Sequence, residues 1–272
     1  MKTLGIIGTG NMAEAIVGGI LAKKIFKPQN IIGFDIDLQK LNSFTKKFRI
    51  QKAKTPLEIT KANIILLAVK PQNMGEALQT LSPLVSKKNL VLTIAAGLPL
   101  KFFRKKLGNN PRIIRLMPNT PALVGLGATA FIATPNCTKK DIQKTQKIFS
   151  AIGMVIKIKN EKQMDAITAL SGSGPAYVYL FVKSLIEGGQ QLGLSSELTR
   201  TLSLQTVKGA LELLSQSKEN PKTLIGRVAS KGGTTEAGLK ILTKKGFESM
   251  IFACLKAAQK RAFELSKMGE NL

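Results

Sequence analysis

The stretch that decides the fold is Leu4-Gly5-Ile6-Ile7-Gly8-Thr9-Gly10-Asn11-Met12-Ala13. A short apolar run leads directly into a Gly-x-Gly-x-x-Ala turn, and a helical pattern follows. Gly8 permits a tight turn, Gly10 lets a pyrophosphate approach the backbone, and Ala13 allows the helix to pack on the strand. This order of strand, glycine turn and helix predicts a dinucleotide site with the phosphates at a helix N-terminus.

A second strand is predicted to end in the carboxylate of Asp35, about twenty residues beyond the glycine turn. Asp35 could accept a hydrogen bond from a ribose 2′-hydroxyl, which favours NAD. Lys40 and Lys46 could instead supply positive charge for a 2′-phosphate. A third interpretation is that Asp35 or Asp37 simply caps the following helix. The residues leave these alternatives open.

Strand-like and helix-like segments alternate through the first half of the chain. The apolar runs are nearly continuous, which is typical of a parallel sheet covered by helices on both faces. The predicted strands are about Thr3–Ile7, Asn30–Phe34, Ile50–Ala53, Ile64–Ala68, Leu90–Ile94, Arg112–Leu116, Thr129–Ala133 and Met154–Ile158. The predicted helices are about Met12–Lys24, Leu38–Phe48, Gln72–Val85, Leu100–Leu107 and Lys139–Phe149. The fold class is therefore an α/β, Rossmann-type doubly wound domain, followed by a region of different character.

Beyond Ile158 the strand signals stop and a helical pattern takes over. The predicted helices are about Lys162–Leu192, Glu197–Ser215, Thr223–Ser230, Thr235–Thr243 and Phe247–Lys267. We expect an NAD(P)-binding Rossmann domain over 1–160 and an all-α domain over 161–272. The long helices carry apolar residues on more than one face, which is typical of helices covered by a partner chain. The sequence predicts a homodimer through this all-α domain.

Composition narrows the class of protein. The formal net charge is +25, but the lysine pairs are scattered and aromatic residues do not alternate with them. We therefore expect a solvated basic surface and no nucleic-acid partner. The chain contains no histidine, so acid–base chemistry must use another residue type, water or the substrate.

Cysteine use and hydropathy indicate the compartment. Cys137 and Cys254 are far apart and have no paired spacing, which disfavours a structural zinc site or a disulfide framework. No apolar run approaches the roughly 18 residues of a membrane span. We expect a cytoplasmic protein with no metal and no membrane partner.

Several short motifs together are specific to one family. They are Ile7-Gly8-Thr9-Gly10-Asn11-Met12-Ala13, Ala68-Val69-Lys70-Pro71, Ile94-Ala95-Ala96-Gly97, Arg115-Leu116-Met117-Pro118-Asn119-Thr120-Pro121-Ala122, Leu170-Ser171-Gly172-Ser173-Gly174-Pro175-Ala176-Tyr177 and Ser230-Lys231-Gly232-Gly233-Thr234-Thr235. In this order the chain closely resembles the pyrroline-5-carboxylate reductases. The first motif is shared with many dehydrogenases, whereas the Arg115 and Gly232 blocks together are highly specific.

The resemblance implies reduction of a cyclic imine, 1-pyrroline-5-carboxylate, to L-proline with NADPH or NADH, the last step of proline biosynthesis. It also implies a C-terminal helical domain that forms an intertwined dimer, often assembled further into rings. The cofactor contacts implied are Ile7, Gly8, Thr9, Gly10, Asn11, Met12, Asp35, Ala68, Val69, Lys70, Pro71, Ala95, Ala96, Gly97 and Asn119. The substrate contacts implied are Thr168, Val228, Ser230, Gly232, Gly233, Thr234 and Thr235.

Thr235 is the candidate catalytic residue, as hydrogen-bond partner or proton donor for the ring nitrogen. Free N–H groups at the start of its helix would bind the substrate carboxylate without a charged side chain. The alternative role for Thr234 and Thr235 is plain N-capping. Asn119 could equally satisfy turn backbone groups, and Lys70 could only set a loop conformation before a proline.

Two positions depart from the family's sequence pattern, and one other class of enzymes shares the family's domain organisation. Lys231 stands where proline is usual, and Gly226 where aspartate is common. The β-hydroxyacid dehydrogenases also combine a Rossmann domain with helices, but they place a catalytic lysine on a C-terminal helix. The stretch Leu170–Tyr177 contains no such lysine.

Overall fold

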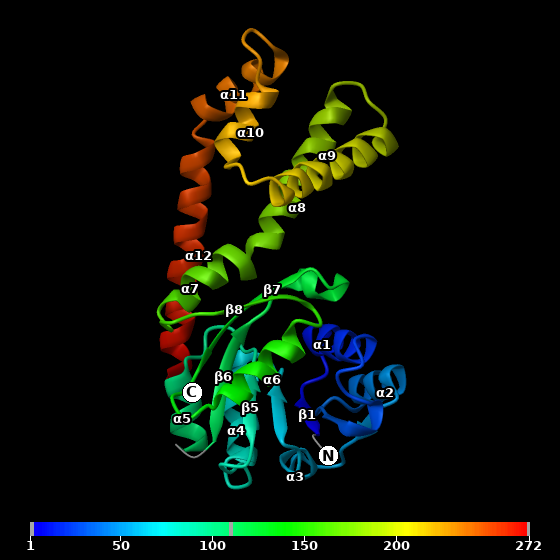
Figure 1. Cartoon of the computed structure of the whole chain (residues 1–272), viewed down its shortest axis with the longest axis vertical. Helices are drawn as coiled ribbons and strands as arrows, with labels where there is room; N and C mark the ends of the chain where they lie inside the picture. The colour runs from blue at the N-terminus through cyan, green and yellow to red at the C-terminus, as the bar shows by residue number, and fades with distance from the viewer. Residues whose placement is uncertain (1–2, 109–110, 271–272) are drawn as a thin grey trace. The chain divides into compact units, whose positions relative to one another are not determined.

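The computed structural model describes residues 3–108 and 111–270. The chain divides into two compact units, which are described separately (Figure 1). Unit 1 comprises Met1–Ser173 and Ala257–Leu272, and unit 2 comprises Gly174–Lys256.

In the described part of unit 1, eight strands form one sheet in the order β3-β2-β1-β4-β5-β6-β7-β8. The strands are β1 (Leu4–Ile7), β2 (Ile31–Phe34), β3 (Gln51–Lys52), β4 (Ile64–Leu67), β5 (Leu90–Thr93), β6 (Arg112–Met117), β7 (Gly127–Ala133) and β8 (Gly153–Lys157). Neighbouring strands are parallel except for β6 and β7, which are antiparallel. The sheet is thus mixed. Strands were predicted at all eight places, but the antiparallel pairing of β6 with β7 was not.

Helices lie between the strands of unit 1. They are α1 (Asn11–Ala22), α2 (Leu38–Phe48), α3 (Pro56–Thr60), α4 (Met74–Leu81), α5 (Leu100–Leu107), α6 (Lys139–Phe149) and α7 (Gln163–Ile167). Short 3₁₀ helices are η1 (Pro28–Asn30), η2 (Pro71–Asn73) and η3 (Thr120–Val124), and a π-helix, η4 (Thr168–Gly172), follows α7. The helix predicted over Gln72–Val85 is shorter because η2 occupies its start. Helix α3 was not predicted.

Two hydrophobic cores cover the two faces of the sheet, as a doubly wound fold requires. Strand β4 illustrates the arrangement, because its side chains alternate between the cores. Ile64 and Leu66 pack in one core with α1, whereas Ile65 and Leu67 pack in the other with α4 and α5. The predicted doubly wound α/β class is confirmed.

Unit 2 is entirely helical. It contains α8 (Gly174–Gln191), α9 (Ser196–Gln216), α10 (Pro221–Val228), α11 (Thr234–Lys244) and the first turns of α12 (Phe247–Glu270). Helices α8 and α9 form a hairpin (Figure 1), and they pack closely at Gly189, where a Cβ atom would lie 2.7 Å from the Thr199 side chain. The single helix predicted over Lys162–Leu192 is divided into α7, η4 and α8.

The division into compact units differs from the predicted boundary at 160/161. Residues after 160 attach to unit 1 through polar contacts of their own. Asn119 Nδ2 donates to Ser171 O, and Arg115 Nη1 donates to Glu161 Oε1 at 2.8 Å. Ser266 Oγ in turn donates to the Asp165 carboxylate at 3.3 Å, which ties the end of α12 to α7. These contacts explain why η4 and the end of α12 belong to unit 1 in the single chain.

Candidate functional site

The turn after β1 contains two glycines with different reasons to be glycine. Gly8 has φ +93°, and a Cβ atom there would lie 2.7 Å from the backbone carbonyl of Ala68. Its N–H donates to Phe34 O at 2.9 Å, which ties the turn to the end of β2. Gly10 has an ordinary φ of −77°, and a Cβ atom there would meet nothing within 4 Å. The fold therefore requires Gly8, whereas the space beside Gly10 is left for something outside the chain.

The N-terminus of α1 faces this space without a side-chain cap. Gly10 is its N-cap residue and offers no side-chain acceptor for the first N–H groups. Such groups and the helix dipole bind anions, and phosphate is the commonest case. The residues present thus fit a dinucleotide pyrophosphate.

Asp35 fixes the glycine turn to the end of β2. Its Oδ2 accepts from Thr9 N at 2.7 Å and from Thr9 Oγ1 at 2.9 Å, and its Oδ1 accepts from Asp37 N at 2.9 Å. A carboxylate has about four acceptor positions. Three are used within the chain, so one remains for a ribose hydroxyl. Helix capping falls to Asp37, whose Oδ1 accepts from Gln39 N and Lys40 N.

A cleft of about 930 Å³ lies at the carboxyl ends of β1, β2 and β4, and all of its lining residues belong to unit 1. It is lined by Ile7, Gly8, Thr9, Gly10, Asn11, Met12, Phe34, Asp35, Ile36, Asp37, Lys40, Pro56, Ala68, Val69, Lys70, Asn73, Glu76, Ala77, Thr80 and Leu81. Ten of the predicted cofactor residues are among them: Ile7–Met12, Asp35 and Ala68–Lys70.

One wall of the cleft was not predicted. It is formed by Pro56 at the start of α3 and by Ala77, Thr80 and Leu81 of α4. Thr55-Pro56 is a helix-start signal that could have revealed α3, because proline is favoured in the first turn. Small and mostly apolar side chains here suit the flat face of an adenine ring.

The lining of the cleft has more negative than positive side chains, although the whole chain is strongly basic. Its lining contains three carboxylates, Asp35, Asp37 and Glu76, and two ammonium groups, Lys40 and Lys70. Lys40 Nζ lies 2.9 Å from Asp37 Oδ2. Their hydrogen bond lowers the pKa of Asp37 and raises the pKa of Lys40, so both are charged near neutral pH.

Other predicted cofactor residues lie outside the lining of this cleft: Pro71, Ala95, Ala96, Gly97 and Asn119. Strand register nevertheless places the loops after β1, β4 and β5 at one edge of the sheet, since Ile7 pairs with Leu67 and Leu67 pairs with Thr93. Gly97 has φ +75° and is covered by α12, because a Cβ atom there would lie 3.1 Å from Leu265 Cβ.

Asn119 connects three segments of unit 1. Its Oδ1 accepts from Ala128 N at 2.8 Å, while its Nδ2 donates to Ser171 O at 3.1 Å. This is the role of satisfying backbone groups that the sequence left open. Thr168 begins the π-helix η4, and its Oγ1 donates to Met164 O at 2.8 Å. π-Helical turns occur frequently at functional sites.

The predicted substrate loop lies in unit 2, at the start of α11. Its N-cap residue, Gly233, offers no side-chain cap, and Gly232 has φ +77°. Thr235 is half-buried, whereas Val228, Ser230 and Thr234 are exposed in the single chain. Glu236 accepts from Gly232 N at 2.8 Å and pairs with Lys240. Glu236 thus takes up the Gly232 N–H, whereas the first N–H groups of α11 itself have no side-chain cap.

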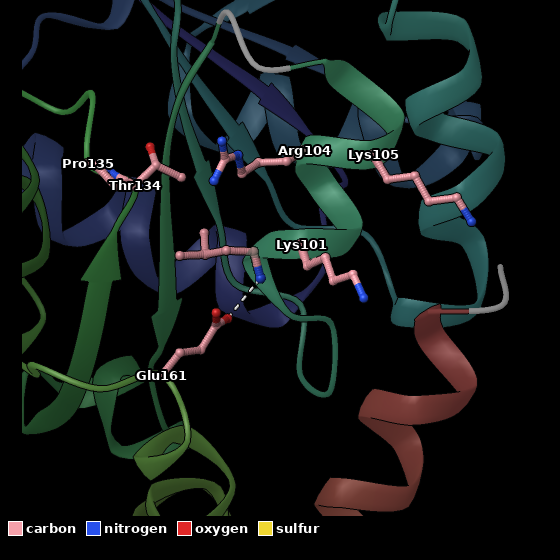
Figure 2. A pocket seen from close by; sticks show the side chains of 7 residues that line it. Lys101, Arg104, Lys105, Thr134, Pro135 and Glu161 are labelled. Atoms are coloured by element: carbon pink, nitrogen blue, oxygen red, sulfur yellow. Dashed lines mark hydrogen bonds between the residues drawn. The ribbon is translucent and has the colours of Figure 1, made fainter.

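A second hollow lies beside α5 and has a volume of about 510 Å³ (Figure 2). Glu161 accepts there from Leu100 N and from Arg115 Nη1, both at 2.8 Å. In Figure 2, Lys101 and Lys105 point away from Glu161 and Thr134. The start of α5 already holds a carboxylate, so this hollow is the weaker candidate. The signature residue Arg115 is 4% exposed and serves this ion pair.

Among the described residues, no group of three or more cysteine, aspartate and glutamate side chains gathers to hold a metal ion. Cys137 is half-buried and Cys254 is exposed, and both are free thiols. No helix within the described ranges is long and apolar enough to span a bilayer.

Two family models match the chain. Residues 161–265 match the model described as pyrroline-5-carboxylate reductase dimerisation. Residues 3–97 match the model described as NADP oxidoreductase, coenzyme F420-dependent.

Similar proteins cover nearly the whole chain. The pyrroline-5-carboxylate reductase of Synechocystis sp. is 40% identical over 97% of this chain and 98% of its own length. The solved structure of a pyrroline-5-carboxylate reductase from Coxiella burnetii is 35% identical, covers 97% of this chain and 98% of its own, and has a TM-score of 0.90. The Plasmodium falciparum pyrroline carboxylate reductase, solved with NADP bound, is 33% identical with a TM-score of 0.89, covering 97% of this chain and 98% of its own.

Proposed function

The chain belongs to the pyrroline-5-carboxylate reductase family, and on that premise we propose the parts its residues play in the reaction. It is an NAD(P)H-dependent reductase of 1-pyrroline-5-carboxylate, and it forms L-proline. The single observation that carries the assignment of the cleft is the contrast between its two glycines. Gly8 is held tightly by Ala68, whereas Gly10 borders empty space at an uncapped helix.

The pyrophosphate would be held by the N-terminus of α1, with Gly10 allowing close approach. Asp35 would use its remaining acceptor position for the adenosine ribose, and the α3–α4 wall would cover the adenine. The loops Ala68–Pro71 and Ala95–Gly97 would line the nicotinamide end, since their strands end at one edge of the sheet. Asn119 would act there by holding η4 in place, as its bonds to Ser171 support.

When bound, the reduced nicotinamide supplies a hydride to C5 of the imine. The chain's own task is to bind, orient and protonate. Free N–H groups at the start of α11 would bind the substrate carboxylate, with Ser230, Gly232, Gly233 and Thr234 shaping the loop. Val228 and Thr168 are further proposed substrate contacts. The Thr235 hydroxyl would donate a hydrogen bond, or its proton, to the ring nitrogen, which takes the electron pair of the C=N bond as the hydride reaches C5. Water would return the proton to the hydroxyl.

The packing of unit 2 supports a homodimer through the C-terminal helices. The structure describes all of Gly174–Lys256, and none of its apolar side chains is buried. Tyr179, Leu180 and Phe252 are each more than 60% exposed. Apolar surface on this scale marks an interface. We propose that a second copy covers these helices and that dimers assemble into rings.

We propose that the enzyme works in the cytoplasm. The free thiols of Cys137 and Cys254 support this location, since thiols persist in reducing compartments. Detection of the protein in the cytosolic fraction of its own cells, and its absence from the membrane fraction, would test this.

The first experiment follows the nicotinamide absorbance band after 1-pyrroline-5-carboxylate is added to enzyme and NADH or NADPH. We expect oxidation of the nicotinamide, with proline formed in equal amount. Thr235→Ala should lower kcat about 10²-fold or more, because general acid catalysis typically contributes about 10²- to 10⁴-fold. Its dissociation constant for NADH should stay unchanged, and Thr235→Ser should restore most of the rate. An unchanged kcat/KM in Thr235→Ala would refute the role of this hydroxyl.

A further inference from the structure

The rim of the cofactor cleft at the end of β2 carries two carboxylates and one ammonium group. Asp35 and Asp37 lie two positions apart, and Lys40 follows in the first turn of α2. All three line the cleft. The charge at this rim is negative, in a chain whose net charge is +25.

Lys40 is the one cation at this rim among the described lining residues, and it is already engaged. Its Nζ lies 2.9 Å from Asp37 Oδ2, and Asp37 Oδ1 also accepts from Lys40 N at 3.1 Å. The same carboxylate therefore orients both the backbone and the ammonium group of Lys40. The other lining cation, Lys70, belongs to the loop after β4.

Asp35 is held by uncharged groups. Its three hydrogen bonds come from backbone N–H groups and the Thr9 hydroxyl, none of which carries a formal charge. A ribose 2′-hydroxyl can donate to its remaining acceptor position. A 2′-phosphate cannot donate when ionised, and it would bring about two negative charges towards the Asp35 and Asp37 carboxylates.

We propose that Asp35, Asp37 and Lys40 together select NADH over NADPH, and that Asp37 sets this preference by holding Lys40 away from a 2′-phosphate. The inference rests on the proposed function only in that the cleft holds a nicotinamide dinucleotide. Asp37 is a positioning residue, since it acts through Lys40. Asp35 has a second task as the support of the glycine turn, so Asp37 is the position at which selectivity can be altered separately.

The test measures binding by calorimetry with nucleotide fragments that cannot react. The probes are 5′-AMP and 2′,5′-ADP, which differ by the 2′-phosphate alone. Wild type should bind 5′-AMP at least about tenfold more tightly, because a dianion beside a unit charge in a solvent-like dielectric loses about that much. Titration of NADH and NADPH should show the same order.

Three variants separate the charges. Asp37→Asn keeps a good N-cap for α2, removes one negative charge and releases Lys40. It should tighten 2′,5′-ADP about tenfold and leave 5′-AMP within about twofold. The double variant Asp37→Asn/Lys40→Gln should lose most of that gain. Glu264→Gln is the matched control, because it frees Arg261 from a similar surface pair on α12 and should change neither affinity.

Each outcome decides the matter. Tighter binding of 2′,5′-ADP than of 5′-AMP by wild type would overturn the inference and leave the reductase assignment intact. So would an Asp37→Asn variant whose ratio of affinities matches wild type. Failure of both fragments and both dinucleotides to bind the folded protein would overturn the assignment of the cleft itself, and this inference with it.

Discussion

The two glycines of the first turn predict opposite phenotypes for the same chemical change. Gly8→Ala places a methyl group 2.7 Å from the Ala68 carbonyl, at a residue with φ +93°. The backbone strain costs about 1–2 kcal/mol and the overlap about 1–3 kcal/mol, so the free energy of unfolding should fall by about 2–5 kcal/mol. Gly10→Ala places its methyl group in empty space at an ordinary φ, and the less favourable N-cap residue should lower the unfolding free energy by about 1 kcal/mol or less.

Binding should respond in the reverse sense. The methyl group of Gly10→Ala occupies the space proposed for the pyrophosphate, and a steric penalty of about 1–3 kcal/mol weakens NADH binding about 5- to 150-fold. The larger Gly10→Val should bind still more weakly and remain folded.

The assays must suit a chain with no tryptophan and two tyrosines. Urea unfolding is best followed by far-ultraviolet circular dichroism, and NADH binding by the fluorescence of the nicotinamide or by calorimetry. A Gly10→Ala variant that binds NADH like wild type would refute the placement of the pyrophosphate. A Gly8→Ala variant as stable as wild type would refute the steric reasoning for the turn.

Three further outcomes are expected. Glu161→Ala should lower the free energy of unfolding by about 2–3 kcal/mol, because it leaves the buried Arg115 guanidinium without its carboxylate. Glu161→Gln keeps a hydrogen-bond acceptor and should lower the free energy of unfolding by less. Equal losses for the two variants in urea unfolding would contradict this account. Burial raises the pKa of Asp141, but hydrogen bonds from Thr138 and the ion pair with Arg112 outweigh burial and hold that pKa below the ordinary 3.8. Wild type should therefore lose stability as the pH falls below about 4, whereas Asp141→Asn should lack this loss. Parallel profiles of unfolding free energy against pH for the two proteins would argue against this account. Phe252→Lys should shift the sedimentation profile towards monomer whereas Leu57→Lys, at an exposed apolar position of unit 1, should not, and identical profiles would count against the proposed interface.

Local patterns predicted the parallel half of the sheet well. The strand and turn around Gly8, and the helices at Leu38–Phe48, Leu100–Leu107 and Lys139–Phe149, follow from periodicity and glycine placement that can be read within about a dozen residues. The strand at Thr129–Ala133 was predicted, but its antiparallel pairing with β6 was not. The short connection from Met117 to Gly127 is the signal that could have revealed this direction, because parallel neighbours need a longer crossover.

The candidate site likewise contains residues that local patterns predicted and residues whose roles depend on distant partners. The residues around Gly8–Met12 and Ala68–Lys70 line the cleft as expected, since they follow strand ends. The bond from Asn119 to Ser171 joins residues 52 positions apart, and Arg115 reaches Glu161 over 46 positions. No periodicity records such pairs, so the roles of these signature residues became visible only in the fold.

The exposed apolar surface of Gly174–Lys256 also bears on how quickly active enzyme can form. A helical segment whose apolar side chains are at most half-buried in the single chain gains less free energy by folding alone than a segment with its own buried core. In the proposed homodimer, the final folding step of this segment would be an encounter between two chains, and its rate would rise with the square of protein concentration. At low protein concentration, newly made chains would remain unpaired for longer, with unit 1 already folded and able to bind a nucleotide.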